Sequence, residues 1–261
     1  MSARFLSGFA ASFGRALRGA LPGKKALILL VVLAVPPLLT AAAGTQADSE
    51  REIRSGYFYV VFFLYLQFLA PLSALLFGTE ILLAESTAGT LPYLFTRPVP
   101  RASILLGKYV AYLIVGALAL ATSLAATLAV YAGPPLPEEI PLRSLLAVVA
   151  VYPAYLAAFA FLSAFTKWSL MAGFLYAFGL EFFLGIIPGM IRKGTMLYYS
   201  HSLLGRWECT PVRLKWFFGE AGPASVPAAL MTLGAVTLIA LLLTAWIVRR
   251  REFVERNPGR A

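Results

Sequence analysis

The sequence predicts an all-α integral membrane protein with six transmembrane helices. Of its 261 residues, 60% are hydrophobic and only 13% are charged, whereas soluble domains carry about 25% charged residues. Several apolar stretches approach or exceed the roughly 20 residues that a helix needs to cross a bilayer. The alternation of polar and apolar residues that is typical of a transmembrane barrel is not seen. We therefore expect one membrane domain over residues 1–261.

Residues 1–23 predict an amphipathic helix that lies in the membrane surface. At ~100° per residue, Phe5, Phe9, Phe13 and Leu17 share one face. Basic residues occupy the opposite face: Arg4, Arg15 and Arg18. Such a helix places its rings among the acyl chains and its guanidinium groups on the phosphates. A cleaved signal peptide is the alternative, but the apolar run that follows is longer than the usual 7–15 residues.

Six apolar stretches are predicted to be the spans. In chain order they are 26–43, 57–77, 105–131, 145–165, 169–187 and 226–248. Pro36 and Pro37 are predicted to kink the first span, and three arginines after the last span form a stop signal. The segment 188–225 is rich in tyrosine, tryptophan and phenylalanine, which favours short helices at the outer interface.

The distribution of positive charge predicts the orientation. Fourteen of the 22 lysines and arginines fall on the side that holds both termini and the segment between spans two and three. The positive-inside rule places that side in the cytoplasm, with the chain in the plasma (inner) membrane. The basic residues of segment 188–225 work against this orientation. Because the basic residues follow the span ends, the net charge of +10 does not indicate nucleic-acid binding.

Motifs for catalysis are missing from the sequence. The string at 19–25 resembles a phosphate-binding loop, but it is one residue short and lacks the hydroxyl that holds magnesium. A single histidine, His201, and a single cysteine, Cys209, leave little material for a metal site, and both are interpreted as incidental loop residues. We expect a chain that is not an enzyme and holds no cofactor or metal of its own.

The segment 80–103, between spans two and three, is charged and punctuated by glycine and proline. Gly89 permits backbone conformations that other residues avoid, and Thr90 can cap a new helix. Leu91 and Leu94 would share one side of that helix, and Pro98 would end it. The pattern predicts a short cytoplasmic helix that a groove on a partner protein receives. A helix resting on lipid is the alternative.

This segment resembles the cytoplasmic loop of type 2 ATP-binding-cassette (ABC) permeases, the membrane subunits of exporters. Pro92 departs from the pattern, since an acidic or polar residue is more frequent there. The resemblance implies a coupling helix, a separate ABC ATPase subunit that supplies ATP and Mg²⁺, and a second permease in a homodimer or heterodimer. The matching positions are Glu85, Gly89, Thr90, Leu91, Leu94, Pro98, Arg101, Gly107 and Lys108.

Two polar residues within spans are candidates for the translocation pathway. Glu181 lies deep in the fifth span, where a charge costs roughly 2.5–3.5 kcal/mol on insertion scales. It lines a pathway or binds a substrate cation in one interpretation. In the other it is a neutral carboxyl, is bonded to a neighbouring span, or reaches the outer interface. Gln67, in the second span, is a weaker candidate.

Two other classes of function remain open at this stage. One is a membrane-embedded enzyme that processes lipids, with Glu181 and loop residues as its site. The other is a membrane scaffold or sensor that binds an ATPase without moving a substrate. The sequence indicates no particular substrate.

Overall fold

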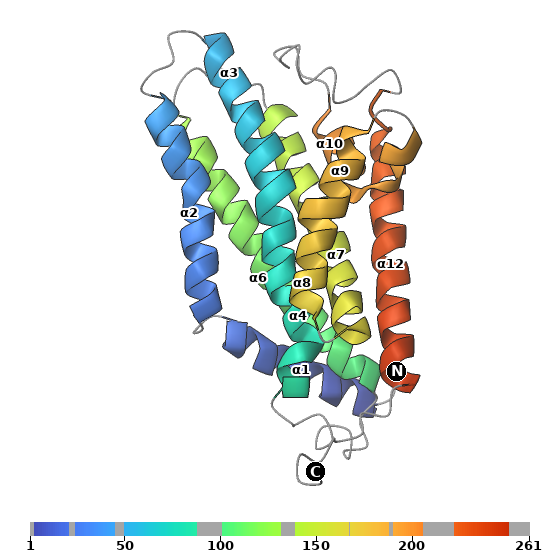
Figure 1. Cartoon of the computed structure of the whole chain (residues 1–261). Helices are drawn as coiled ribbons and strands as arrows, with labels where there is room; N and C mark the ends of the chain where they lie inside the picture. Colours follow the sequence, from blue (N-terminus) through green and yellow to red (C-terminus); the bar gives the residue numbers. More distant parts are fainter. Residues whose placement is uncertain are drawn as a thin grey trace, which may run out of the picture.

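The structure is a computed structural model that describes residues 3–20, 24–44, 50–87, 101–131, 139–166, 168–187, 190–205 and 222–250. Within these ranges all regular structure is helical, which confirms the predicted all-α class. The long helices run side by side in a bundle, and α1 (Ala3–Ala20) lies across one end of it (Figure 1). The helix α12 (Val226–Arg250) finishes at that same end.

Among the described residues, four helical stretches are long and apolar enough to cross a membrane. They are Ser55–Leu82, Ala102–Val130, Glu139–Phe165 and Val226–Arg250. The first belongs to a continuous helix made of α3 (Glu50–Tyr59), η1 (Val60–Leu69) and α4 (Ala70–Thr87). The second lies in α6 (Arg101–Val130), and the third is α7 (Glu139–Phe165).

Two further apolar helices are shorter. One is Leu27–Ala42, within α2 (Lys24–Gly44). The other is Ser169–Gly185, within a helix made of α8 (Ser169–Phe174), η2 (Leu175–Leu180) and α9 (Glu181–Ile186). All six predicted stretches are therefore helical, and four of them have the length of a span. The count of six spans stays a prediction.

The two prolines of the first apolar stretch lie inside α2, and a neighbouring helix compensates for the second of them. Pro37 has no N–H, so the carbonyl of Leu33, four residues earlier, loses its partner within the helix. Ser123 Oγ of α6 donates to that carbonyl at 2.6 Å. The Tyr65 hydroxyl of η1 makes hydrogen bonds with Ser123 Oγ at 2.7 Å and with Thr127 Oγ1 at 2.8 Å. This buried network joins α2, η1 and α6.

Glycines bring the helices close together. A Cβ atom on Gly78 of α4 would lie 2.7 Å from Phe159 Cβ of α7. A Cβ atom on Gly116 of α6 would overlap the Tyr152 hydroxyl, which donates to the Tyr112 carbonyl at 3.3 Å. In lipid, where hydrophobicity does not drive helices together, such close contact is a main source of association.

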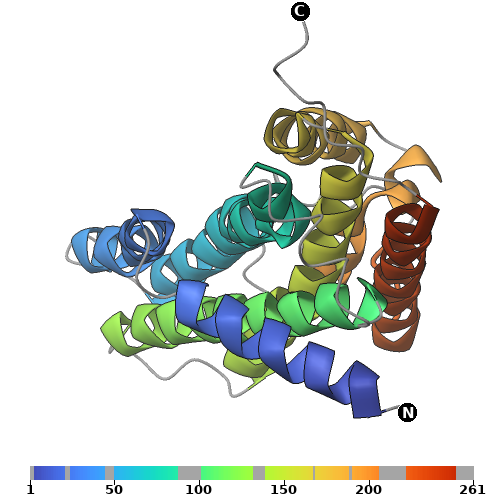
Figure 2. The ribbon, with the colours of Figure 1, turned by 90° about the horizontal axis from the view of Figure 1, so that it is seen from below.

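The helix α1 crosses in front of α6 when the bundle is seen from below (Figure 2). A Cβ atom on Gly107 of α6 would overlap Ser12 Oγ of α1 and lie 2.7 Å from the Phe9 carbonyl oxygen. The buried residues of α1 are small ones at four-residue spacing, namely Gly8, Ser12, Ala16 and Ala20. Its aromatic residues are half-buried beside this stripe. The predicted N-terminal helix is confirmed, and its small face is the one that packs on the protein.

Two short helices follow the fifth apolar stretch, η3 (Met190–Gly194) and α10 (Met196–Leu204). The interpretation of His201 as an incidental loop residue is wrong, because His201 lies in α10 with no exposed surface. Its ring stacks on Phe62 with centroids 3.7 Å apart. Burial lowers the pKa of this imidazole to about 3, so the ring is neutral near pH 7. Cys209 lies outside the described residues.

The contact at Gly78 generates a stability prediction. We expect Gly78→Ala to lower stability by about 1–3 kcal/mol, since the added methyl group meets backbone and Cβ atoms of α7 that cannot rotate away. Gly234→Ala in α12 is the matched control, because a Cβ atom there has no neighbour within 4 Å. Thermal unfolding of both variants in lipid nanodiscs measures the difference, and equal melting temperatures would contradict the packing argument.

Candidate functional site

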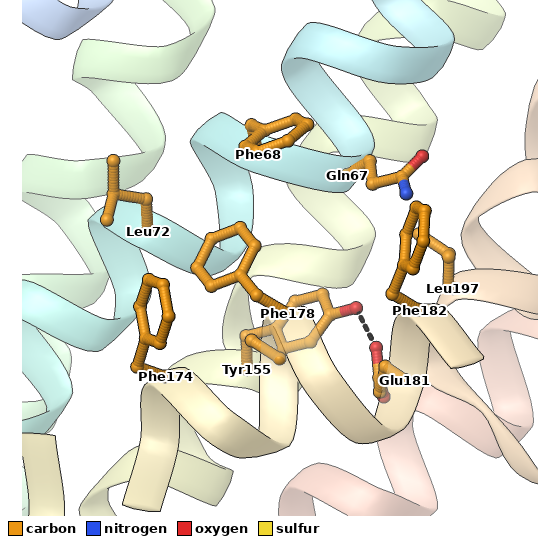
Figure 3. Close-up of a pocket in the computed structure, with 10 residues that line it drawn as sticks. Gln67, Phe68, Leu72, Tyr155, Phe174, Phe178, Glu181, Phe182 and Leu197 are labelled. Carbon is orange, nitrogen blue, oxygen red and sulfur yellow. Dashed lines mark hydrogen bonds between the residues drawn. The ribbon is translucent and has the colours of Figure 1, made fainter. Parts of the chain in front are cut away.

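A cavity of about 400 Å³ lies between the helix that carries η1 and α4 and the helix that carries η2 and α9 (Figure 3). Its walls are mainly aromatic, with the side chains of Phe68, Tyr155, Phe174, Phe178 and Phe182. Leu72, Ala177 and Leu197 complete the apolar lining, and Gln67 and Glu181 are the polar members. The volume falls within the range of small-molecule sites, about 300–1,000 Å³.

Both walls of the cavity contain a π-helical stretch. Val60–Leu69 carries Gln67 and Phe68, and Leu175–Leu180 carries Ala177 and Phe178. A π-helix closes its hydrogen bonds over five residues instead of four, and short π-helical stretches occur frequently at functional sites. The wider winding changes which side chains face the neighbouring helix, so a regular α-helical projection of the sequence does not give the lining.

Glu181 is buried at the cavity wall and held by three donors. Its side chain is 1% exposed. The Tyr155 hydroxyl of α7 donates to Oε2, as the dashed line in Figure 3 marks. The Tyr176 hydroxyl donates to Oε1 at 2.9 Å, and the backbone N–H of Met196 in α10 donates to the same oxygen at 3.2 Å. All three donors are neutral, so none of them balances the charge that an ionised Glu181 would carry.

Gln67 lies on the other wall and is 7% exposed. Its Oε1 atom is buried and has no hydrogen-bond partner among the described residues. A buried acceptor left unsatisfied costs roughly 1–3 kcal/mol. A ligand in the cavity that donates a hydrogen bond to this amide oxygen would remove that cost.

The structure places the two pathway candidates together and separates them from the other predicted residues. Gln67 and Glu181 line one cavity although 113 positions separate them in the sequence. Glu181 is bonded to a neighbouring span through Tyr155, as one interpretation held, and also lines the cavity. The bond to a neighbouring span is therefore confirmed, whereas a role of Glu181 in a pathway stays a prediction.

Two members of the segment motif fix the start of α6. Gly107 contacts α1, as described above. Lys108 is 8% exposed and its Nζ atom donates to the Ile81 carbonyl of α4 at 3.0 Å. Lys108 is thus a buried contact between two helices. A cation near the C-terminal end of α4 also interacts favourably with the helix dipole.

The remaining predicted residues are only partly described. Glu85 lies in the last turn of α4 and Arg101 begins α6, but their side chains are outside the described set, as is that of Arg4. Gly89, Thr90, Leu91, Leu94 and Pro98 lie outside the described residues. Arg15 and Arg18 are exposed and border a shallow hollow of about 390 Å³ on α1.

Sequence reasoning missed the aromatic walls and the tyrosines that hold Glu181. The four-residue spacing of Phe174, Phe178 and Phe182 was a usable signal, since it places three rings on one face beside Glu181. No local signal pointed to Tyr155, which lies in a different helix. Its role depends on how α7 and α9 pack.

The chain was compared with known proteins. The family model described as "ABC-2 family transporter protein" matches residues 24–206. The search of curated proteins found no match to the sequence. The family match covers α2 to α10 and therefore both walls of the cavity. The chain belongs to the ABC-2 transporter family, whose members are membrane subunits of ABC transporters.

Proposed function

We propose that this permease subunit pairs with a second permease, either a copy of itself or a related chain, to form an export pathway. A separate ABC ATPase docks on segment 80–103 and binds the ATP and Mg²⁺ that the transport cycle uses. The observation that carries the proposal is the pair of contacts at Gly107 and Lys108, within a chain of the ABC-2 family. They join the start of α6 to both α1 and α4.

These contacts give a mechanical route from the docking segment to the membrane. The end of α4 and the start of α6 lie at the same end of the bundle as α1 (Figure 1). A force on the segment between Thr87 and Arg101 acts on both helices, because the Lys108–Ile81 hydrogen bond holds them together. The contact at Gly107 carries the same displacement into α1.

The route continues from α4 to the cavity. The residues at both ends of η1 have helical backbone angles, with φ −62° at Tyr59 and φ −64° at Ala70. The helix is therefore continuous from the segment that receives the ATPase to Gln67 and Phe68. A tilt or rotation of this helix changes the distance between Gln67 and Glu181. Closure of the ATPase dimer on ATP would thus alter access to the cavity, which supports a role of these residues in translocation.

Docking on segment 80–103 is tested by reversing charge. We expect the double variant Glu85→Arg with Arg101→Glu to lose the ATPase, because docking helices depend on complementary charge around an apolar contact. The tagged chain is purified from membranes. An ABC ATPase in the eluate is identified by mass spectrometry and by vanadate-sensitive ATP hydrolysis, which we expect to fall at least tenfold.

The matched control carries the same substitutions at the other end of the bundle. Glu139 and Arg143 form an exposed ion pair at 3.1 Å, so the exchange Glu139→Arg with Arg143→Glu keeps the pair. We expect this control to retain the ATPase fully. Retention of the ATPase by both double variants would refute docking at segment 80–103.

The cytoplasmic location of this end of the bundle is tested by thiol labelling. In a Cys209→Ser background, we expect Thr87→Cys to react with a membrane-impermeant maleimide only after the cells are permeabilised. Glu139→Cys, at the opposite end of the bundle, should react in intact cells. The reverse pattern would exclude an ATPase on segment 80–103, because ATP is supplied in the cytoplasm.

A further inference from the structure

We propose that the cavity between Gln67 and Glu181 binds a hydrophobic organic cation with a single positive charge, of the ammonium type. The inference names the substrate class of the proposed permease and in that sense rests on the proposed function. The binding itself depends only on this chain. Three observations carry it: the buried carboxyl group of Glu181, the aromatic walls and the unsatisfied oxygen of Gln67.

Glu181 is the one carboxyl group in the cavity lining, and a cation bound beside it would stabilise its ionised form. Its three partners are two tyrosine hydroxyls and one backbone N–H, and it makes no ion pair with a described residue. Neither lysine nor arginine is among the cavity lining. A buried carboxylate is stable when a cation accompanies it. A positively charged ligand would complete this site.

The aromatic walls favour the same charge. Phe178 stands between the two sides of the cavity, with its ring centroid 5.5 Å from that of Phe68 and 4.9 Å from that of Phe174. Phe182 lies across from Gln67, beside Glu181 (Figure 3). The faces of aromatic rings carry negative potential and attract ammonium groups, most strongly where water is displaced. The rings also provide apolar surface for the body of the ligand.

Gln67 adds a third, independent contribution. Its side chain is more than nine-tenths buried, and its Oε1 atom lacks a partner among the described residues. An amide oxygen accepts an ammonium N–H or solvates a quaternary ammonium through its dipole. An anion would be repelled by an ionised Glu181, the one carboxyl group of the lining.

Bare metal ions fit the cavity less well than an organic cation. Calcium takes six to eight oxygen ligands, whereas the lining supplies one carboxylate and one amide oxygen among apolar side chains. Within the described residues no three histidine, cysteine, aspartate or glutamate side chains gather. The hydrophobic part of an organic cation, in contrast, matches the rings that form most of the wall.

The rim of the cavity indicates the direction of entry. Phe68, Phe174 and Phe182 are 48%, 55% and 40% exposed, so the aromatic wall continues to the outside of the bundle. That outside faces lipid or a second permease when the helices cross a membrane. An amphiphilic cation that has dissolved in the bilayer can therefore reach Glu181 along apolar surface.

The test compares three probes of the same shape. Phenyltrimethylammonium, tert-butylbenzene and benzenesulfonate each carry a phenyl ring and a tetrahedral head, with charges of plus one, zero and minus one. Binding to the purified chain in phosphatidylglycerol nanodiscs is measured by equilibrium dialysis, with empty nanodiscs subtracted. We expect saturable binding of phenyltrimethylammonium at least about tenfold tighter than that of either other probe, since a charge-assisted contact distinguishes them.

Variants assign the binding to this cavity. We expect Glu181→Gln to raise the Kd for phenyltrimethylammonium about tenfold or more, and Phe182→Leu to raise it about threefold. Matched controls remove the same chemistry elsewhere: Glu139→Gln changes an exposed carboxylate, and Phe183→Leu changes the neighbouring ring, which does not line the cavity. Both controls should keep the parent affinity. If Glu181→Gln fails to fold, Gln67→Leu and Phe182→Leu still test the site.

Several results would overturn the inference. They are tert-butylbenzene binding as tightly as the cation, benzenesulfonate binding more tightly, and a folded Glu181→Gln variant with unchanged affinity. Replacing part of the lipid by phosphatidylethanolamine distinguishes two sources of the ammonium group. If phosphatidylethanolamine competes with the probe, the natural ligand is a lipid headgroup. If it does not compete, the natural ligand is a free amphiphile. Absence of an ABC ATPase from the purified parent chain would refute the proposed function alone, since the dialysis uses no ATPase.

Discussion

A bilayer offers no hydrogen-bond donors or acceptors, and the interior of this protein is organised around that constraint. Several polar atoms that lack a partner within their own helix find one on another helix. Ser123 satisfies the carbonyl that Pro37 leaves free, and Lys108 reaches the carbonyl of Ile81. Each of these bonds joins two helices at a defined depth. Polar residues therefore determine which helices are neighbours, and apolar residues fill the space between them.

Close packing and hydrogen bonding act at the same places. Gly116 leaves room for the Tyr152 hydroxyl to reach a carbonyl of α6. Gly107 brings α1 against α6 one residue before Lys108 bonds to α4. A larger residue at either glycine would separate the helices and break the neighbouring hydrogen bond. The contribution of these glycines is thus larger than the contact area of the missing side chain would suggest.

The sequence predicted the features that depend on residues close together in the chain. Hydropathy and length gave the six apolar helices, and helical periodicity gave α1, because both patterns are contained in short stretches of chain. The short motif of segment 80–103 indicated the family that the family model confirms. Its predicted coupling helix lies outside the described residues and stays a prediction.

Features that depend on tertiary packing could not be predicted from local sequence patterns. Tyr155 and Glu181 come from different helices, and nothing near either residue indicates the partner. His201 was misjudged for a related reason. Hydropathy gave no span between 188 and 225, so a polar residue there looked like a loop residue, whereas α10 folds back against α7 and α12 and buries it. The π-helical stretches also escaped prediction, since they alter the periodicity on which sequence reasoning relies.

Gln67 departs from the constraint that governs most of the bundle, and it does so at the cavity where the proposed function places the translocated molecule. Its neighbour in the cavity, Glu181, has three donors, while Gln67 Oε1 has none among the described residues. Gln67 also lies on the helix that leads to segment 80–103, whereas Glu181 is bonded to α7 and α10. One wall of the cavity is therefore anchored to the bundle, and the other belongs to the helix on which the ATPase would act. Movement of that helix would therefore change the contacts that a ligand makes between the two walls.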